Sequence, residues 1–286
     1  VNDYCIDFES TNNLSLVAHG GIPSDPGASN WSQVMDDEYT GSNNFGGIDV
    51  EFWTSTEDSG ASGQYDAPTL FPDYDAKDYD ELIDGDAINS GGYHSAPYLV
   101  LFDTTASNTK DPDLEVDDEG FTGGNIAIIH EEASSNRECV TDSGQEYCEN
   151  PDDRYKSGTP HGGFVFVHFS EPVNVHSIDL VDMESGSNQR GSIGFYNEAG
   201  NLLPNDTMVA MTYDDGVSEM TDGNWGTQTF SNLYSSLDIT TLVIRMQGSG
   251  GFDNIAFTRA TEVPEPSSLA IFTIALLGLA RIKRQA

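Results

Sequence analysis

The stretch GGFVFVHFSEPVNVHSIDLVD, residues 162–182, decides the fold class. It holds two runs rich in β-branched and aromatic residues, 162–169 and 173–182, separated by Ser-Glu-Pro. Such residues favour strands. The segment 164–167 is apolar at every position, which is typical of a strand covered on both faces. We therefore predict two successive inner strands here.

Similar short runs occur along most of the chain, each bounded by Gly, Asn, Asp or Pro. They span residues 47–54, 97–103, 124–131, 191–197, 207–213, 240–247 and 251–258. Nothing before residue 265 keeps a helical period over three turns. This pattern predicts an all-β protein, an antiparallel β-sandwich and within that class a jelly roll, occupying residues 1–262. Two acidic segments, 55–92 and 132–160, lack such runs and predict long loops.

The charge is strongly one-sided, with 11 Lys and Arg against 48 Asp and Glu, a net charge of −37. Such a field repels nucleic acid and anionic lipid headgroups, so we expect no nucleic-acid partner. It attracts divalent cations. General solubility in salt water explains the acidity equally well, and local metal binding could add to it.

The three cysteines divide into a pair and a remainder. Cys139 and Cys148 enclose a short polar stretch with a glycine at its turn, which predicts a disulfide and an oxidising compartment. Eight intervening residues without histidine partners do not match zinc spacing. Cys5 is left as a free thiol, which we expect to be buried. The chain begins at Val1 without an apolar leader, and we expect that an export signal has been removed.

Catalytic signatures are absent from the sequence: it contains no H-E-x-x-H, G-x-S-x-G or C-x-x-C. We predict that the protein is not an enzyme. His168 and His176 are expected to face strand neighbours rather than a metal. Carbohydrate binding by exposed aromatic residues is a rival function, although Trp53 and Trp225 adjoin strands and are expected in the core.

The last 24 residues, 263–286, form a separate segment. Pro264, Glu265 and Pro266 precede a short apolar helix, Leu269 to Ala280, and the basic residues Arg281, Lys283 and Arg284 follow. A helix of that length rises about 20 Å, short of a hydrocarbon core of about 30 Å. The basic end fits a cytoplasmic C-terminus.

This three-part order resembles the PEP-CTERM sorting signal of Gram-negative bacteria. The resemblance implies transient membrane insertion, recognition by an exosortase and processing near the motif. It also implies export to the cell surface or extracellular matrix, often beside exopolysaccharide production.

The body resembles a galactose-binding-like jelly-roll domain common in exported PEP-CTERM proteins. The resemblance rests on CIDFES (5–10), the segment 99–116 with its DPDL sequence, GNIAIIHE (124–131), the segment 151–185 and GSGGFDNIAF (248–257). The activity of that family is generally undefined, so the resemblance supports the fold, and we expect a structural or adhesive protein. A lectin-like module that binds exopolysaccharide and a self-assembling matrix subunit are the alternatives.

Calcium is the expected cofactor, because close carboxylates destabilise a compact state unless cations or protons neutralise them. The segment 103–113 supplies Asp103, Asp111 and Asp113, the last two fixed around a proline. Glu9 and Asp253 form a second candidate set, since jelly rolls often bring their first and last strands together. The alternative is that all five are solvated surface acids.

Overall fold

In the computed structural model, the structure describes residues 3–11, 16–18, 20–21, 23–27, 31–35, 38–56, 98–104, 124–130, 139–149, 163–181, 191–203, 209–210, 225–230, 238–246 and 250–260. The C-terminal segment from residue 261 and most of the first predicted acidic loop lie outside this part of the chain. The predicted C-terminal helix and jelly-roll connectivity therefore stay predictions. None of the described helical residues forms a span long and apolar enough to cross a membrane.

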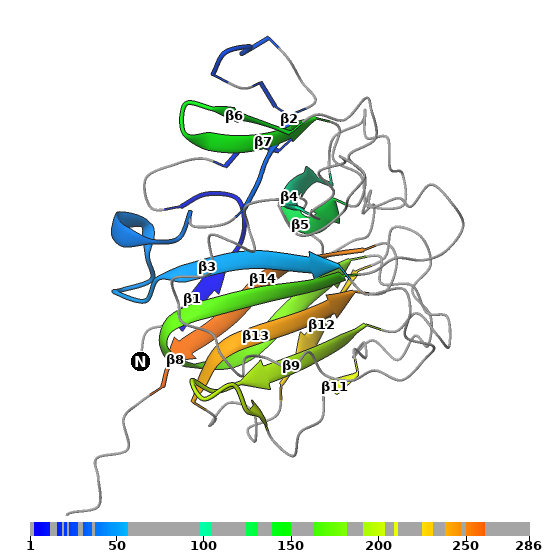
Figure 1. The fold of residues 1–286 in the computed structure, drawn as a ribbon. Coiled ribbons are helices and arrows are strands. Elements are labelled where there is room, and N and C mark those ends of the chain that lie inside the picture. The colour runs from blue at the N-terminus through cyan, green and yellow to red at the C-terminus, as the bar shows by residue number, and fades with distance from the viewer. Residues whose placement is uncertain are drawn as a thin grey trace, which may run out of the picture.

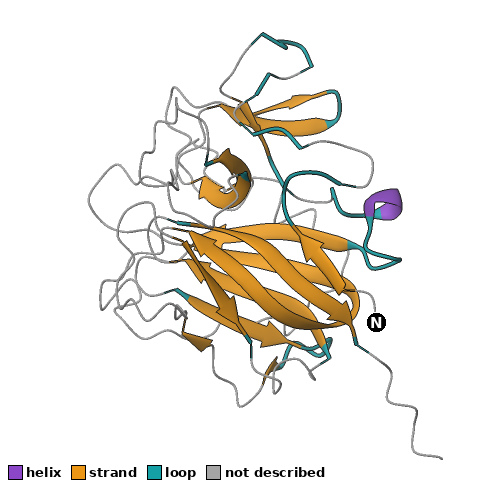
Figure 2. Ribbon diagram, turned by 180° about the vertical axis from the view of Figure 1, so that it is seen from behind, coloured by secondary structure: helices purple, strands orange, loops and turns teal. Residues whose placement is uncertain are grey.

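The described residues form fourteen strands and one short 3₁₀-helix (Figures 1 and 2). The elements are β1 (Asp3–Ile6), β2 (Trp31–Gln33), η1 (Gly41–Asn43), β3 (Val50–Thr56), β4 (Tyr98–Asp103), β5 (Asn125–His130), β6 (Cys139–Asp142), β7 (Gln145–Glu149), β8 (Gly163–Val181), β9 (Ser192–Tyr196), β10 (Leu202–Leu203), β11 (Val209–Ala210), β12 (Trp225–Thr229), β13 (Ile239–Met246) and β14 (Gly251–Arg259). Every predicted run contains a described strand, and the all-β, antiparallel class is confirmed. The strands β1, β2, β6, β7, β10 and β12 are not among the predicted runs.

The stretch that decides the fold is one strand, β8, where the sequence predicted two. Its first half, 163–169, pairs with β3 and β13, and its second half, 173–181, pairs with β12 and β14. The pattern predicts two strands because Ser-Glu-Pro interrupts the apolar run, but the chain stays extended there. Ser170 donates its N–H to the Asp49 carbonyl, and the Pro172 carbonyl accepts from Ala260 N–H. β8 thus carries the chain from one layer to the other.

The two layers enclose the main hydrophobic core. Both belong to one 11-stranded sheet that is continuous through β8. Strand pairing places β3, the first half of β8, β13 and β9 in one layer, and β12, the second half of β8 and β14 in the other. Side chains alternate along β8, so Val165, Val167 and Phe169 point into the core while Phe164 and Phe166 belong to the opposite face. Both halves of β8 contribute to the same buried cluster, which is the arrangement of a β-sandwich.

A second, three-stranded sheet of β2, β7 and β6 lies above the main body in Figure 1. It corrects the prediction of a long loop over residues 132–160, because β6 and β7 form a hairpin within it. The turn residues Ser143 and Gly144 both have positive φ, 57° and 88°, as a two-residue type I′ turn requires. Cys139 and Cys148 are direct partners in the hairpin and form the predicted disulfide.

Candidate metal centre

The candidate site lies where β14 exchanges one neighbouring strand for another. Residues 255–258 of β14 pair with β1, whereas residues 251–252 pair with β5. Asp253 and Asn254 fall between these two ladders. On that edge of β14 the ladder is therefore interrupted.

Asp253 also faces a like charge across the sheet. It is the direct partner of Asp179 on β8, and like charges in that position destabilise an antiparallel pair. The register then shifts between Asp253 and Ala256, and Asn254 has a left-handed φ of 50°, which marks a bulge. The two carboxylates differ in the hydrogen bonds that they accept from the protein. Asp179 accepts hydrogen bonds from Thr227 Oγ1 at 2.6 Å and Asn254 Nδ2 at 2.9 Å.

Asp253 is left with an unsatisfied oxygen. The residue is 6% exposed, and its Oδ1 has no hydrogen-bond partner. Burial raises the pKa of Asp253 from 3.8 to about 8, and the backbone N–H of Asn254 opposes the rise. The charges of Asp179, Asp7 and Glu9 contribute to the raised pKa. The site therefore strongly favours a proton or a cation at this carboxylate.

The segment after β1 brings two further acids to the gap. Phe8 is buried and has a left-handed φ of 51°, and it separates Asp7 from Glu9. Glu9 Oε1 accepts the backbone N–H of Asn125 at 2.6 Å, and the Phe8 carbonyl accepts from Asn125 Nδ2 at 3.0 Å. These bonds fix the segment to the start of β5. A Cβ at Gly124 would collide with the Glu9 carboxylate, so the close approach requires glycine.

Asp103 joins the same cluster from β4, where it is the direct partner of Asn125. Desolvation raises the pKa of Glu9, and the charges of Asp7 and Asp103 raise it further, while the Asn125 N–H lowers it. The raised pKa values thus couple carboxylates from the segment after β1 and from β4, β8 and β14. We call Asp7, Glu9, Asp103, Asp179 and Asp253 the carboxylate cluster.

No arginine or lysine among the described residues neutralises the carboxylate cluster. The two described arginines interact elsewhere: Arg245 lies over the Phe164 ring at 5.9 Å, and Arg259 pairs with Glu171 at 3.1 Å. Nor do any three of the described acids bring carboxylate oxygens within 4.8 Å of one another. An ion here would need main-chain, amide or water oxygens besides the carboxylates.

The structure thus brings together three predicted ligands from two separate candidate sets. Glu9, Asp253 and Asp103 lie in one cluster, while Asp111 and Asp113 lie outside the described residues. Asp7 and Asp179 were not predicted. Asp7 stands two positions before Glu9 in the same DFE segment, which is a usable signal, but Asp179 sits inside an apolar run and is revealed only by the register of β8 on β14.

Cys5 is a free cysteine, as predicted, but its side chain is exposed rather than buried. It pairs with Ala256 on the outer side of β1, between the inward-facing Ile6 and Tyr4. Partial desolvation of the thiol and the neighbouring carboxylates of the cluster raise the pKa of Cys5 to about 11. The thiol is therefore protonated, and poorly nucleophilic, at neutral pH.

The histidines on β8 face strand neighbours, in line with the prediction. His168 Nδ1 lies 3.2 Å from Thr241 Oγ1, and His176 Nε2 lies 2.9 Å from Thr258 Oγ1. The correction is that both belong to one strand and lie in different layers.

The described tryptophans do not form an exposed aromatic ladder. Trp53 is 7% exposed and stacks on Phe166 at 5.4 Å between ring centroids, as expected of a core residue. Trp31 and Trp225 are half-buried, and Trp225 packs against a buried cluster that includes Val181. The tyrosines of the first acidic loop lie outside the described residues.

A family model described as the PEP-CTERM protein-sorting motif matches residues 262–285. None of the curated proteins matches the chain. The motif match covers the segment whose resemblance was stated from the sequence. It indicates exosortase-dependent export to the cell surface in bacteria and, with it, processing by an exosortase.

Proposed function

We propose that the protein is a calcium-stabilised structural or adhesive component of the cell surface or extracellular matrix of a Gram-negative bacterium. The observation that carries the calcium assignment is the buried Asp253, whose Oδ1 lacks a hydrogen bond and whose nearest ladder partner is another aspartate. The surface role rests on the sorting motif at residues 262–285.

The donor set suits calcium better than a transition metal. The carboxylate cluster contains only hard oxygen ligands, which suit calcium, magnesium and manganese. Calcium also tolerates irregular geometry and takes six to eight oxygens, including carbonyls, amides and water. That tolerance matters here, because the cluster does not preform a compact three-carboxylate cage.

The chain's residues explain why such a site would stabilise the fold. Glu9 is joined to the start of β5 by the Asn125 N–H, Asp103 pairs with Asn125 from β4, and Asp253 is buried at the bulge of β14. When neutralised together, these acids would fasten the N-terminal segment to β14 and β4. In the absence of a cation, their mutual repulsion and desolvation oppose the same contacts. Extracellular modules commonly use calcium of modest affinity in this way.

Thermal unfolding tests the proposal. We expect the unfolding midpoint of the wild-type protein to rise between EGTA and millimolar calcium, because a ligand that binds only the folded state stabilises it by mass action. An unchanged midpoint would refute calcium stabilisation.

Two sets of variants locate the ion. Asp253→Asn should lose the calcium shift, whereas Asp238→Asn, an exposed aspartate just before β13, should keep it. The double variant Asp111→Ala/Asp113→Ala should also keep the shift. Loss of the shift in that double variant alone would move the site to the 103–113 segment.

A further inference from the structure

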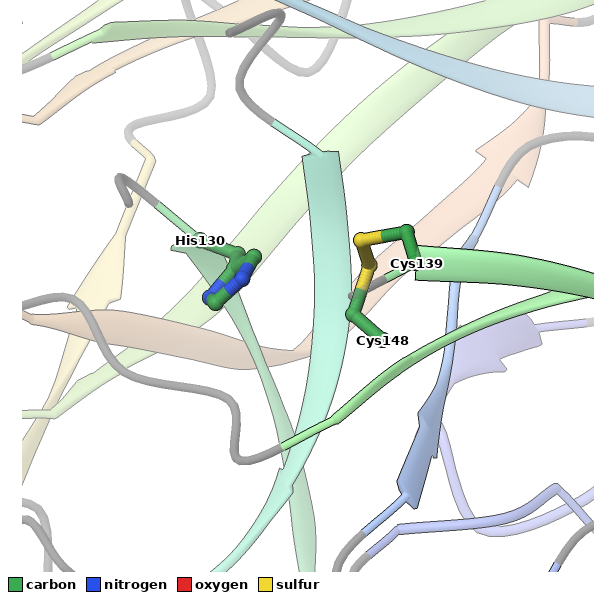
Figure 3. A group of neighbouring side chains, drawn as sticks. All are labelled: His130, Cys139 and Cys148. Carbon is green, nitrogen blue, oxygen red and sulfur yellow. A yellow bond between two sulfur atoms is a disulfide. The ribbon is translucent and has the colours of Figure 1, made fainter. Parts of the chain in front are cut away.

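A second metal-ligand set lies apart from the carboxylate cluster, around the disulfide. His130 ends β5, Cys139 begins β6, and Cys148 lies in β7. The imidazole and the two sulfurs lie within 4.8 Å of one another (Figure 3). His130 is 2% exposed and Cys148 is fully buried. In the oxidised protein the two sulfurs are bonded to each other and offer no thiolate.

We propose that reduction of the Cys139–Cys148 disulfide converts this corner of the protein into a zinc site, with the two thiolates and the His130 imidazole as its three protein ligands. The fourth position would be open to water or to another group. The site differs from the carboxylate cluster in every ligand, and it goes beyond the structural role proposed above.

The dimensions suit a tetrahedral ion. With Zn–S bonds of about 2.3 Å and Zn–N bonds of about 2.0 Å, ligand atoms lie roughly 3.5 to 3.8 Å apart. The three atoms here already share a region smaller than 4.8 Å across. The two cysteines are direct partners on antiparallel strands, and the turn at Ser143 and Gly144 keeps them side by side. The ladder would hold both thiols close after the sulfur–sulfur bond opens.

The charge balance suits burial. Two thiolates, a neutral imidazole and Zn²⁺ sum to zero, so the loaded site avoids the cost of a buried net charge. Its surroundings are apolar: the buried cluster around Cys148 consists of Val34, Val100, Phe102, Ile126, Ile128 and Val181. Soft sulfur and imidazole ligands select zinc over calcium.

The sequence concealed this set because the histidine comes from another strand. In the sequence, two cysteines separated by eight residues without histidine partners do not match zinc spacing. The fold instead supplies His130 from β5, whose neighbour β4 contacts the small sheet through the Val34–Val100 bridge.

The zinc site forms in two steps, reduction of the disulfide and binding of zinc. A dithiol reductant transfers two electrons and two protons to the disulfide and itself becomes a disulfide, leaving Cys139 and Cys148 as thiols. Zinc then replaces the two thiol protons, which pass to the medium. The reduced state is the one that an exported chain has before it reaches an oxidising compartment.

The test compares oxidised and reduced protein. Excess calcium is present throughout to occupy the oxygen ligands of the carboxylate cluster, so that cobalt and zinc report on the sulfur site. Wild-type protein is reduced with dithiothreitol, freed of it by anaerobic gel filtration and titrated with Co²⁺ and then Zn²⁺. We expect a sulfur-to-cobalt charge-transfer band that saturates at one equivalent and is abolished by zinc, in the reduced protein only. His130→Gln should weaken cobalt binding at least tenfold, whereas His176→Gln, which alters a half-buried histidine outside this ligand set, should not.

Near-ultraviolet circular dichroism covers the case in which reduction loosens the fold. Stoichiometric zinc should then restore the spectrum of the reduced wild type but not that of His130→Gln. The proposal is overturned if reduced wild type gives no charge-transfer band, if His130→Gln binds as tightly as wild type, or if zinc fails to restore a spectrum lost on reduction.

Discussion

Replacing Asp253 with asparagine should stabilise the calcium-free protein while removing its response to calcium. The substitution keeps the shape of the side chain and removes its charge. Burial raises the pKa of Asp253 to about 8 in the folded protein, against 3.8 for an exposed aspartate. At pH 7 the unfolded chain therefore ionises this group, whereas the folded protein holds a proton on it.

The magnitude follows from that difference. Between the pKa of the unfolded chain, 3.8, and pH 7, each pH unit costs about 1.4 kcal/mol. Asp253 therefore lowers the folding stability of the calcium-free protein by up to roughly 4 kcal/mol at pH 7. The pKa of Asp253 is higher in the folded protein than in the unfolded chain. Below about pH 4 the group is protonated in both states, so the stability of the protonated form is fully present. That stability is lost as the pH rises toward 8. Asparagine does not titrate. The advantage of Asp253→Asn should therefore be largest near neutral pH and shrink to about 0.5 kcal/mol at pH 4.

Urea unfolding followed by circular dichroism, in EGTA and in calcium, measures both effects. In EGTA at pH 7, Asp253→Asn should be the more stable protein. At a calcium concentration one hundred times the dissociation constant, wild type should gain about 2.7 kcal/mol and the variant little. Asp238→Asn serves as the control for a change in net charge. A variant that is less stable than wild type in EGTA, or whose difference from wild type does not depend on pH, would refute the reasoning.

Three further predictions concern other parts of the chain. Cys139→Ser should lower the free energy of unfolding by about 2 to 3 kcal/mol, which is the chain-entropy value for so short a loop. Peptide mapping of the wild-type protein without reduction should find Cys139 joined only to Cys148. Gly124→Ala should destabilise the protein and weaken its calcium response, because φ is 142° there and the new methyl group would displace the Glu9 carboxylate; an unchanged calcium shift would contradict this. Intact-mass measurement of protein extracted from the native surface should show loss of most of 267–286, and a full-length mature chain would contradict processing at the motif.

Much of the fold follows from residue pattern alone, because buried strands need β-branched and aromatic residues wherever they occur. That requirement located both halves of β8, together with β13 and β14. It could not locate β6 and β7, whose residues are largely polar. Their hairpin depends on a tight turn and a disulfide rather than on an apolar face. Nor could pattern distinguish an extended corner from a turn at Ser170 to Pro172.

The candidate site was predictable only in part, for a geometric reason. Glu9 and Asp253 could be associated because the first and last strands of such folds often meet. The pairing of Asp253 with Asp179 depends on register, and a one-residue slip would have placed Asp179 elsewhere. The association of Asp103 with Glu9 depends on Asn125, which contacts both segments from β5. No spacing within the sequence encodes these contacts.

Anomalous diffraction from crystals grown in calcium tests the central claim most directly. We expect one strong anomalous peak at the bulge of β14, within about 2.3 to 2.6 Å of carboxylate oxygens from Asp253 and Glu9. A map with no peak there, in which Asp253 Oδ1 instead binds water or a protein donor, would contradict the calcium site.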